Sequence, residues 1–196
     1  MTIAGMLRKH GHDTPRYVDG SGRVRFKTGT TATVSGLAVT PHTFHGGKQH
    51  TPPSGASGKW WETPGIIERD REEMRAHFPS FYEVPADDEC PPAWAGVIDT
   101  GRGKFPVIIC HRTDLSLPSV VPAVPNQRQR REGRHVRKSP HLYLNGNLCV
   151  AAAEDWNPER DSIATVVAWA AHWHACYVDW LTSGQWPTEG IGARAA

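Results

Sequence analysis

The most constraining feature of this chain is a long apolar segment near its C-terminal end. Residues 162–183 place large apolar side chains three and four positions apart, which is the spacing of one helix face. That face comprises Ile163, Val166, Val167, Ala170, Trp173, Tyr177, Trp180 and Leu181. Trp169 and Cys176 lie off this face, so we expect a helix that is covered on more than one side. Asp161 or Ser162 is the predicted N-cap of this helix. Gly184, followed by Pro187, is predicted to end it at the C-terminal side.

The segment before this helix predicts a second helix and several strands. Residues 65–78 repeat apolar groups at helical spacing, after Pro64 and up to Pro79. Short runs typical of strands follow at 81–84, 94–99 and 105–110. Prolines in residues 117–124 exclude a central strand there and predict an edge strand or an extended connection. The predicted fold class is therefore α+β.

The first part of the chain differs in composition from the rest. Residues 1–58 hold few large apolar groups, and an Asp-Gly-Ser-Gly turn predicts a hairpin over 16–27. The run HGGKQHTPPSGASGK at 45–59 is typical of a linker or a loose loop. We therefore divide the chain into an N-terminal extension of unknown role, residues 1–58, and a main domain, residues 59–196.

Composition limits the expected partners and compartment. A net charge of +2 over 196 residues gives no overall attraction to nucleic acid or to a membrane. The first residues lack the apolar core of a secretory signal, and no apolar run reaches the ~18 residues of a membrane helix. Four cysteines in such a chain favour free cytosolic thiols over a disulfide framework. We expect a cytoplasmic protein with no membrane partner.

One of the four cysteines lies in a setting that suits chemistry. Cys110 ends an apolar strand and Cys176 lies within the apolar helix, so we expect both to be buried and inert. Cys90 lies among acidic residues, which disfavour a thiolate. Cys149 follows a turn at 144–147, whose exposed backbone amides can favour a thiolate or an oxyanion. Cys149 is therefore either a nucleophile or one more core cysteine.

Other kinds of site find less support in the sequence. The eleven His and four Cys form no C-x-x-C pair and no H-E-x-x-H motif, so we predict no metal and no other cofactor. No G-x-S-x-G elbow or glycine-rich phosphate loop is present either. Residues 126–138 form a basic loop, which is either solvated or a contact for an acidic partner or nucleic acid. Arg131 and Arg134 are the candidate binding residues of this loop.

The segment SPHLYLNGNLCVAAAEDWNP, residues 139–158, resembles the active-site stretch of ubiquitin-conjugating enzymes. The matching residues are Pro140, Tyr143, Gly146, Cys149, Trp156 and Pro158, with the Trp one residue closer than is usual in that family. The order of the upstream elements is also similar, and the likeness covers about residues 60–190. The Pro-His-x-Tyr and Leu-Cys pattern and the Trp-rich final helix resemble the bacterial members that occur in anti-phage operons.

This resemblance implies a UBC-like fold with an N-terminal helix, an antiparallel meander sheet, an active-site loop and a C-terminal Trp-rich helix. It implies that Cys149 takes the C-terminus of a ubiquitin-like protein or of a cGAS-like nucleotidyltransferase as a thioester and passes it to an amine. The implied partners are an activating enzyme, that modifier and a protein target, in ubiquitin-like tagging or CBASS pathways. Tyr143 and Trp156 are then expected to be binding residues.

The implied site leaves two roles open. His141 stands where the eukaryotic family has an Asn that supports the oxyanion, and it either donates the same hydrogen bond or only braces the loop. Glu154, Asp155 and Asp161 can each assist the attacking amine, and Asp155 is our candidate. The alternatives to an enzyme are a non-catalytic module of the same fold, and nucleic-acid binding through residues 128–138.

Overall fold

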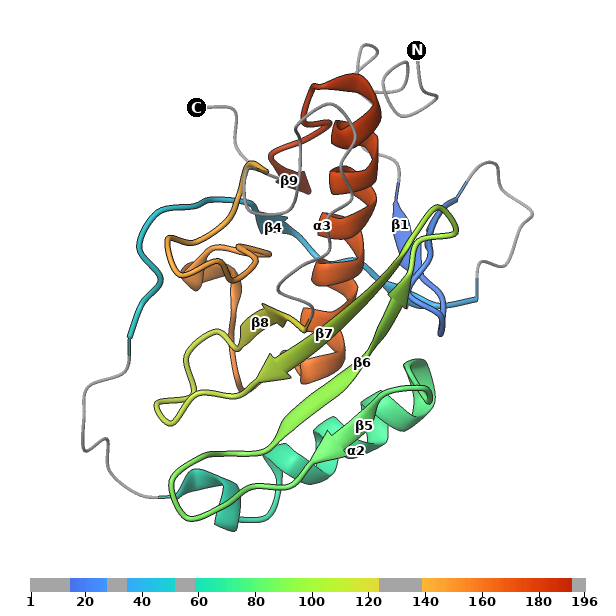
Figure 1. Ribbon diagram of the computed structural model, residues 1–196. Helices are drawn as coiled ribbons and strands as arrows, with labels where there is room; N and C mark the ends of the chain where they lie inside the picture. Colours follow the sequence, from blue (N-terminus) through green and yellow to red (C-terminus); the bar gives the residue numbers. More distant parts are fainter. Residues whose placement is uncertain (1–14, 28–34, 52–58, 124–138, 192–196) are drawn as a thin grey trace.

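The computed structural model describes residues 15–27, 35–51, 59–123 and 139–191. In this part of the chain, two α-helices pack with three small antiparallel sheets (Figure 1). The predicted α+β class is therefore confirmed, whereas the finer UBC-like assignment stays a prediction. The basic loop with Arg131 and Arg134 lies outside the described residues.

The largest sheet is an antiparallel meander with the strand order β5-β6-β7-β8. Its strands are β5 Tyr82–Val84, β6 Ala93–Asp99, β7 Lys104–Cys110 and β8 Ser119–Pro122. Phe105, Val107 and Ile109 alternate along β7 and are buried, as expected for a sheet with one face on the core. The proline-containing β8 lies at the edge of the sheet, which confirms one of the two predicted states of that segment.

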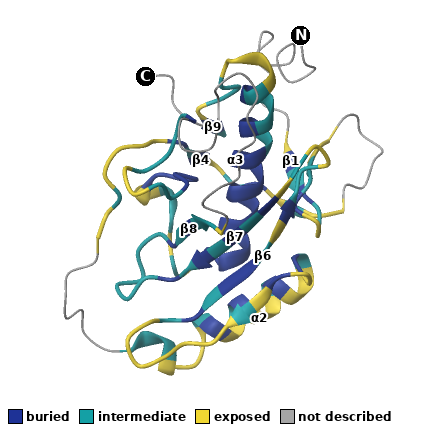
Figure 2. Cartoon of the chain, viewed as in Figure 1, coloured by how far each residue is buried: buried dark blue, intermediate teal, exposed yellow. Residues whose placement is uncertain are grey.

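The long helix α3, Ile163–Ser183, runs through the middle of the molecule and is buried along most of its length (Figure 2). It begins after Ser162 and ends at Gly184, which takes the left-handed conformation with φ 74°. Trp169 and Cys176 are buried together with the predicted face, so the expectation of cover on several sides is confirmed. Neither described helix is long and apolar enough to cross a membrane.

The remaining elements complete the cover around α3. The helix α2, Ile66–His77, packs against α3 and leaves its outer face exposed (Figure 2). The strands β1 Arg16–Val18, β2 Val24–Phe26 and β3 Leu37–Ala38 form a second sheet, which confirms the predicted hairpin. The strand β4, His42–Thr43, pairs with β9, Gly190–Ile191. Val18, Val39 and Phe44 join the same core as α3, so the described part of residues 1–58 shares one core with the rest.

Candidate active site

Cys149 lies in an irregular segment that we call the cysteine loop, residues 139–152. The residue before it, Leu148, pairs with Val120 of β8, and the Cys149 N–H donates to the His141 carbonyl at 3.0 Å. The predicted turn precedes it, with the Gly146 N–H donating to the Tyr143 carbonyl at 2.9 Å. The Cys149 side chain is 0% exposed. The loop thus holds the thiol against the core, facing inward from the edge of the meander.

The environment of the thiol combines burial with two hydrogen-bond donors. The His45 N–H donates to Cys149 Sγ at 3.2 Å, and the Tyr143 hydroxyl forms a second hydrogen bond with it. Burial raises the pKa of the Cys149 thiol, the two hydrogen bonds oppose this increase, and the nearby Asp155 carboxylate adds to it. Burial and the hydrogen bond to Cys149 also raise the pKa of Tyr143. At neutral pH the enclosed Cys149 is therefore held as a thiol rather than a thiolate.

The cover over Cys149 is residues 44–50, which we call the strap. Its main chain runs beside the cysteine loop, with Gly47 and Tyr143 forming a parallel bridge. The Leu144 N–H donates to the Gly47 carbonyl at 2.8 Å, next to the bond from His45 to the thiol. The strap therefore lies directly on the candidate nucleophile.

The strap is also held by the side chain of Gln49. Gln49 Oε1 accepts from the amides of Asn145 and Asn147, both at 2.8 Å, and Gln49 Nε2 donates to Ser119 Oγ at 3.1 Å. Residues 45–51 thus form a loop, as predicted, but its contacts hold it in place, so it is neither loose nor a free linker. Sequence reasoning missed these contacts because their partners lie 70 to 98 positions away. The signal that could have found them is Phe44, the one large apolar side chain in this polar run.

His141 uses both its main chain and its ring in the closed loop. Its backbone adopts a left-handed φ of 57°, and its carbonyl accepts from the Cys149 N–H and, at 3.1 Å, from Trp173 Nε1. The ring Nδ1–H donates to the His45 carbonyl at 2.8 Å, and Nε2 lies 3.4 Å from the Glu189 carboxylate. The main-chain carbonyl of His141 thus contacts the Cys149 residue, while the ring of His141 is bound to the strap. The oxyanion role of that ring stays a prediction.

The three candidate acids have different surroundings. Asp155 Oδ2 accepts from the N–H groups of Thr43 at 2.7 Å and Ala152 at 2.9 Å, and its charge acts on Cys149. Glu154 is exposed. Asp161 is 3% exposed and is bound by the neighbouring guanidinium and a backbone amide. Asp155 is therefore the candidate acid whose charge reaches Cys149, whereas Asp161 is buried and already paired.

Trp156 and the other three cysteines lie in several different parts of the fold. Trp156 is half-buried, and its Nε1–H donates to the Leu115 carbonyl at 2.9 Å, which braces a neighbouring turn. Cys90 is exposed, Cys110 is half-buried and Cys176 is buried in α3. Burial also raises the pKa of the Cys110 thiol. Among the described residues, no group of three or more His, Cys, Asp or Glu side chains is placed to hold a metal ion.

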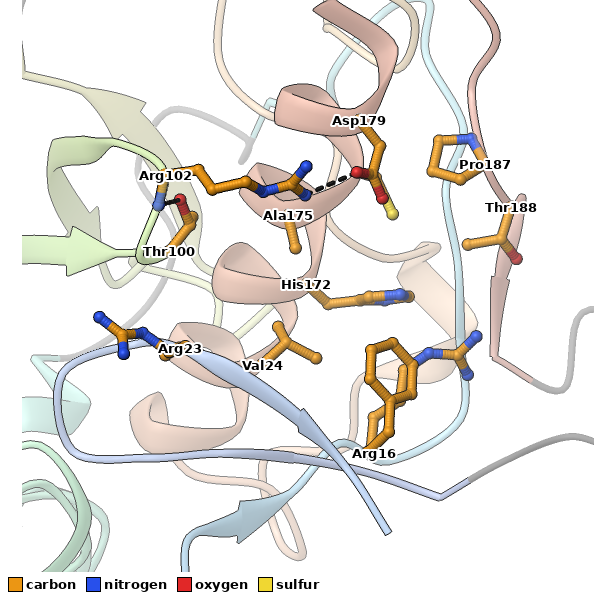
Figure 3. Close-up of a pocket in the computed structure, with 12 residues that line it drawn as sticks. Arg16, Arg23, Val24, Thr100, Arg102, His172, Ala175, Asp179, Pro187 and Thr188 are labelled. Atoms are coloured by element: carbon orange, nitrogen blue, oxygen red, sulfur yellow. Dashed lines mark hydrogen bonds and ion pairs between the residues drawn. The ribbon is translucent and has the colours of Figure 1, made fainter. Parts of the chain in front are cut away.

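A separate pocket of about 230 Å³ lies between the first hairpin, the turn after β6 and another part of the α3 surface (Figure 3). Arg16, Arg23 and Arg102 line it, and Arg102 is paired with Asp179 across the opening. His172 forms part of its wall and donates through Nδ1 to His42 Nε2 at 3.0 Å. The pocket does not include Cys149, so it is not the site of the candidate nucleophile.

Comparison with known proteins assigns this sequence to a family. Residues 70–193 match the family model described as type II CBASS E2 protein, a region that holds Cys149, the cysteine loop and α3. Searches of curated proteins and of solved structures found no match. Because the matched region covers well over half of the sequence, the chain belongs to the type II CBASS E2 protein family.

Proposed function

We propose that this protein is an acyl carrier that conjugates a protein modifier to an amine through a thioester at Cys149. The modifier is a ubiquitin-like protein or a cGAS-like nucleotidyltransferase, delivered by an activating enzyme of the same anti-phage operon. The observation that carries the proposal is the placement of Cys149 Sγ against the Tyr143 hydroxyl, beside His141 and Asp155, within a family of E2 proteins. A hydroxyl donor of this kind stabilises a thiolate once the thiol ionises.

The reaction has two acyl transfers. In the first, the Cys149 thiolate attacks the carbonyl carbon of the activating enzyme's thioester. A bond forms between that carbon and Cys149 Sγ, the bond to the activating enzyme's sulfur breaks, and the released thiolate takes up the proton that Cys149 loses. In the second, a neutral lysine amine attacks the new thioester, the C–N bond forms and the bond from the carbonyl carbon to Cys149 Sγ breaks. The departing Cys149 thiolate takes up the proton that the nitrogen loses as the amide forms.

The attacking amine and the oxyanion both need help. A lysine amine is protonated at neutral pH, since its ordinary pKa is about 10.4. We assign the removal of its proton to Asp155, whose carboxylate lies within electrostatic reach of Cys149. We assign to the His141 ring the hydrogen bond that stabilises the tetrahedral oxyanion. The strap engages the His141 ring through the His45 carbonyl, so the role of that ring requires the strap to open.

One observation favours a second function, a non-catalytic module of the same fold. The Cys149 side chain is 0% exposed, and an inert core cysteine has the same burial. A module of this kind binds the modifier or the activating enzyme without forming an adduct. The thioester assay below separates the two functions.

The test is adduct formation on a non-reducing gel. The protein is mixed with the activating enzyme encoded beside it, ATP and the candidate modifier. We expect an adduct that thiol reagents cleave, that Cys149→Ala abolishes, and that Cys149→Ser replaces with a slower, thiol-resistant ester. Cys110→Ala is the control, because it removes a half-buried thiol in another part of the fold and is expected to leave the adduct intact. An adduct that persists in Cys149→Ala contradicts the assignment, and no adduct in any variant favours the binding module.

A further inference from the structure

The enclosure of Cys149 conflicts with the access that its proposed reaction needs. In such an attack the reacting atoms must approach to about 3–3.5 Å. The neighbours of Cys149 on the core side, Leu148, Val150 and Ala151, are each at most 1% exposed. On the other side lies the strap, whose His45 N–H is 3.2 Å from Sγ. An acyl group can therefore reach Sγ only if the core or the strap moves.

The strap is the side that can move without uncovering apolar surface. Residues 45–48 are exposed and are held mainly by hydrogen bonds, which water can replace. Phe44 differs, because it is 2% exposed and packs against the rings of His141, His172 and Trp186. The strap thus has a firmly packed first residue followed by a weakly packed stretch over the thiol. We infer that the stretch beyond Phe44 is the part that opens.

The main-chain contacts of the strap also indicate what kind of peptide can bind in its place. Its main chain pairs with the cysteine loop, with the Leu144 N–H donating to the Gly47 carbonyl and the His141 ring donating to the His45 carbonyl. An added Cβ on Gly46 would lie 3.3 Å from the Leu142 carbonyl oxygen, so this position has little room for a side chain. Gly47 itself takes a left-handed φ of 85°, so the groove suits a glycine-containing peptide with a very small residue beside the thiol.

We propose that residues 44–50 are a pseudosubstrate strap, which occupies the groove along Tyr143 and Leu144 that the C-terminal tail of the acyl donor enters when Cys149 is loaded. The donor tail then takes over the hydrogen bonds from Leu144 and from the His141 ring, and its terminal carbonyl replaces the His45 amide at Sγ. The identity of this occupant rests on the proposed function. The closing of Cys149 by the strap does not.

Alkylation of Cys149 tests the strap without any partner protein. The full chain is treated with iodoacetamide, and peptide-resolved mass spectrometry follows Cys149 separately from the exposed Cys90. Gln49→Ala removes the hydrogen bonds to Asn145, Asn147 and Ser119. We expect it to speed the alkylation of Cys149 by about tenfold, because each such bond contributes modestly to the closed state. The rate at Cys90 is expected to stay unchanged.

Three matched variants make the result specific. Gln49→Glu keeps an oxygen that accepts from both asparagines, so Cys149 is expected to react close to the wild-type rate. Asn145→Ala removes a single bond and is expected to speed the reaction by about threefold. Lys48→Ala alters an exposed strap side chain for which the described structure shows no hydrogen bond or ion pair, and is expected to have no effect. An unchanged Cys149 rate in both Gln49→Ala and Asn145→Ala overturns the proposal.

A peptide added in trans tests the groove itself. The eight-residue sequence of positions 43–50, TFHGGKQH, is added to the Gln49→Ala protein before iodoacetamide. We expect it to protect Cys149, and the same peptide with Val in place of the first Gly to protect much less. Equal protection by both peptides, or none by either, overturns the proposed peptide groove.

These readouts separate the strap from the proposed function. If Gln49→Ala speeds alkylation but no thioester forms on any variant, the strap is supported as the cover of Cys149 and the conjugating activity fails. If the thioester forms at the same rate in wild type and Gln49→Ala while alkylation is also unchanged, the conjugating activity is supported and the strap is refuted.

Discussion

Acidification is expected to destabilise the fold through two buried histidines. His174 is 2% exposed, its Nδ1–H donates to the Ala170 carbonyl at 2.8 Å, and its ring lies 4.5 Å from that of Phe105. His42 is 1% exposed, its Nδ1–H donates to the Thr40 carbonyl at 2.8 Å, and its Nε2 accepts from His172. Burial lowers the pKa of each from 6.5 to about 4. Both are therefore neutral in the folded protein at neutral pH.

The sign and size of the effect follow from proton linkage. Between pH 6.5 and about 4 the unfolded chain holds protons on these two histidines that the folded chain does not, so the free energy of unfolding falls as the pH falls. At about pH 5 the unfolded histidines are almost fully protonated, and each one costs about 2 kcal/mol. The two together remove about 4 kcal/mol, a large fraction of a typical total stability of about 5–15 kcal/mol.

Urea unfolding at about pH 7 and about pH 5 measures this loss. The control is His174→Asn, which retains an amide that can donate to the Ala170 carbonyl but cannot titrate. Other titrating groups act equally in both proteins and cancel in the comparison. We expect the variant to lose about 2 kcal/mol less than the wild type over this pH range. The same loss in both proteins would show that His174 does not stay neutral in the fold and would refute the reasoning.

Two further predictions concern the site and its support. His141→Ala is expected to slow amine transfer by about 10²-fold, while loading of Cys149 falls much less, because the ring acts on the oxyanion of the second step; single-turnover assays measure the two steps, and equal losses would contradict the role. Asp70→Ala is expected to cost about 3–5 kcal/mol in urea unfolding, because Asp70 is 0% exposed and accepts from His111 Nε2 at 2.8 Å and from the Ile163 N–H at 3.0 Å. Asp70→Asn retains the shape and one acceptor and is expected to cost less, so equal losses would indicate a role in packing alone.

Local patterns were sufficient to predict much of the fold. The helix α3 could be predicted because a capping residue, a run of apolar spacing and Gly184 all lie in one continuous segment. The first hairpin could be predicted for a similar reason, since the Asp19 carboxylate accepts from residues two and four positions ahead and forms the turn by itself. Each of these elements is specified by residues that are close in sequence.

The candidate site could be predicted only in part. The resemblance pointed to Cys149, and the turn before it is marked by Gly146 and its neighbours. The strap could not be predicted, because main-chain hydrogen bonds and the Gln49 amide hold it, and neither leaves a periodic pattern in the sequence. The bond from His42 to His172, 130 positions away, is hidden for the same reason.

The strap and the residue before it act on every polar group to which we assign chemistry. The His45 N–H contacts Cys149 Sγ, the His45 carbonyl engages the His141 ring, and the Thr43 N–H engages the Asp155 carboxylate. Burial, to which the strap contributes together with the core, is the main cause of the raised Cys149 pKa. Opening would therefore give access to Sγ, favour the thiolate and transfer the His141 ring from the His45 carbonyl to the donor in a single movement. Because the donor tail itself would cause that movement, the nucleophile would become reactive only when its substrate is present, which protects it from adventitious oxidation and acylation.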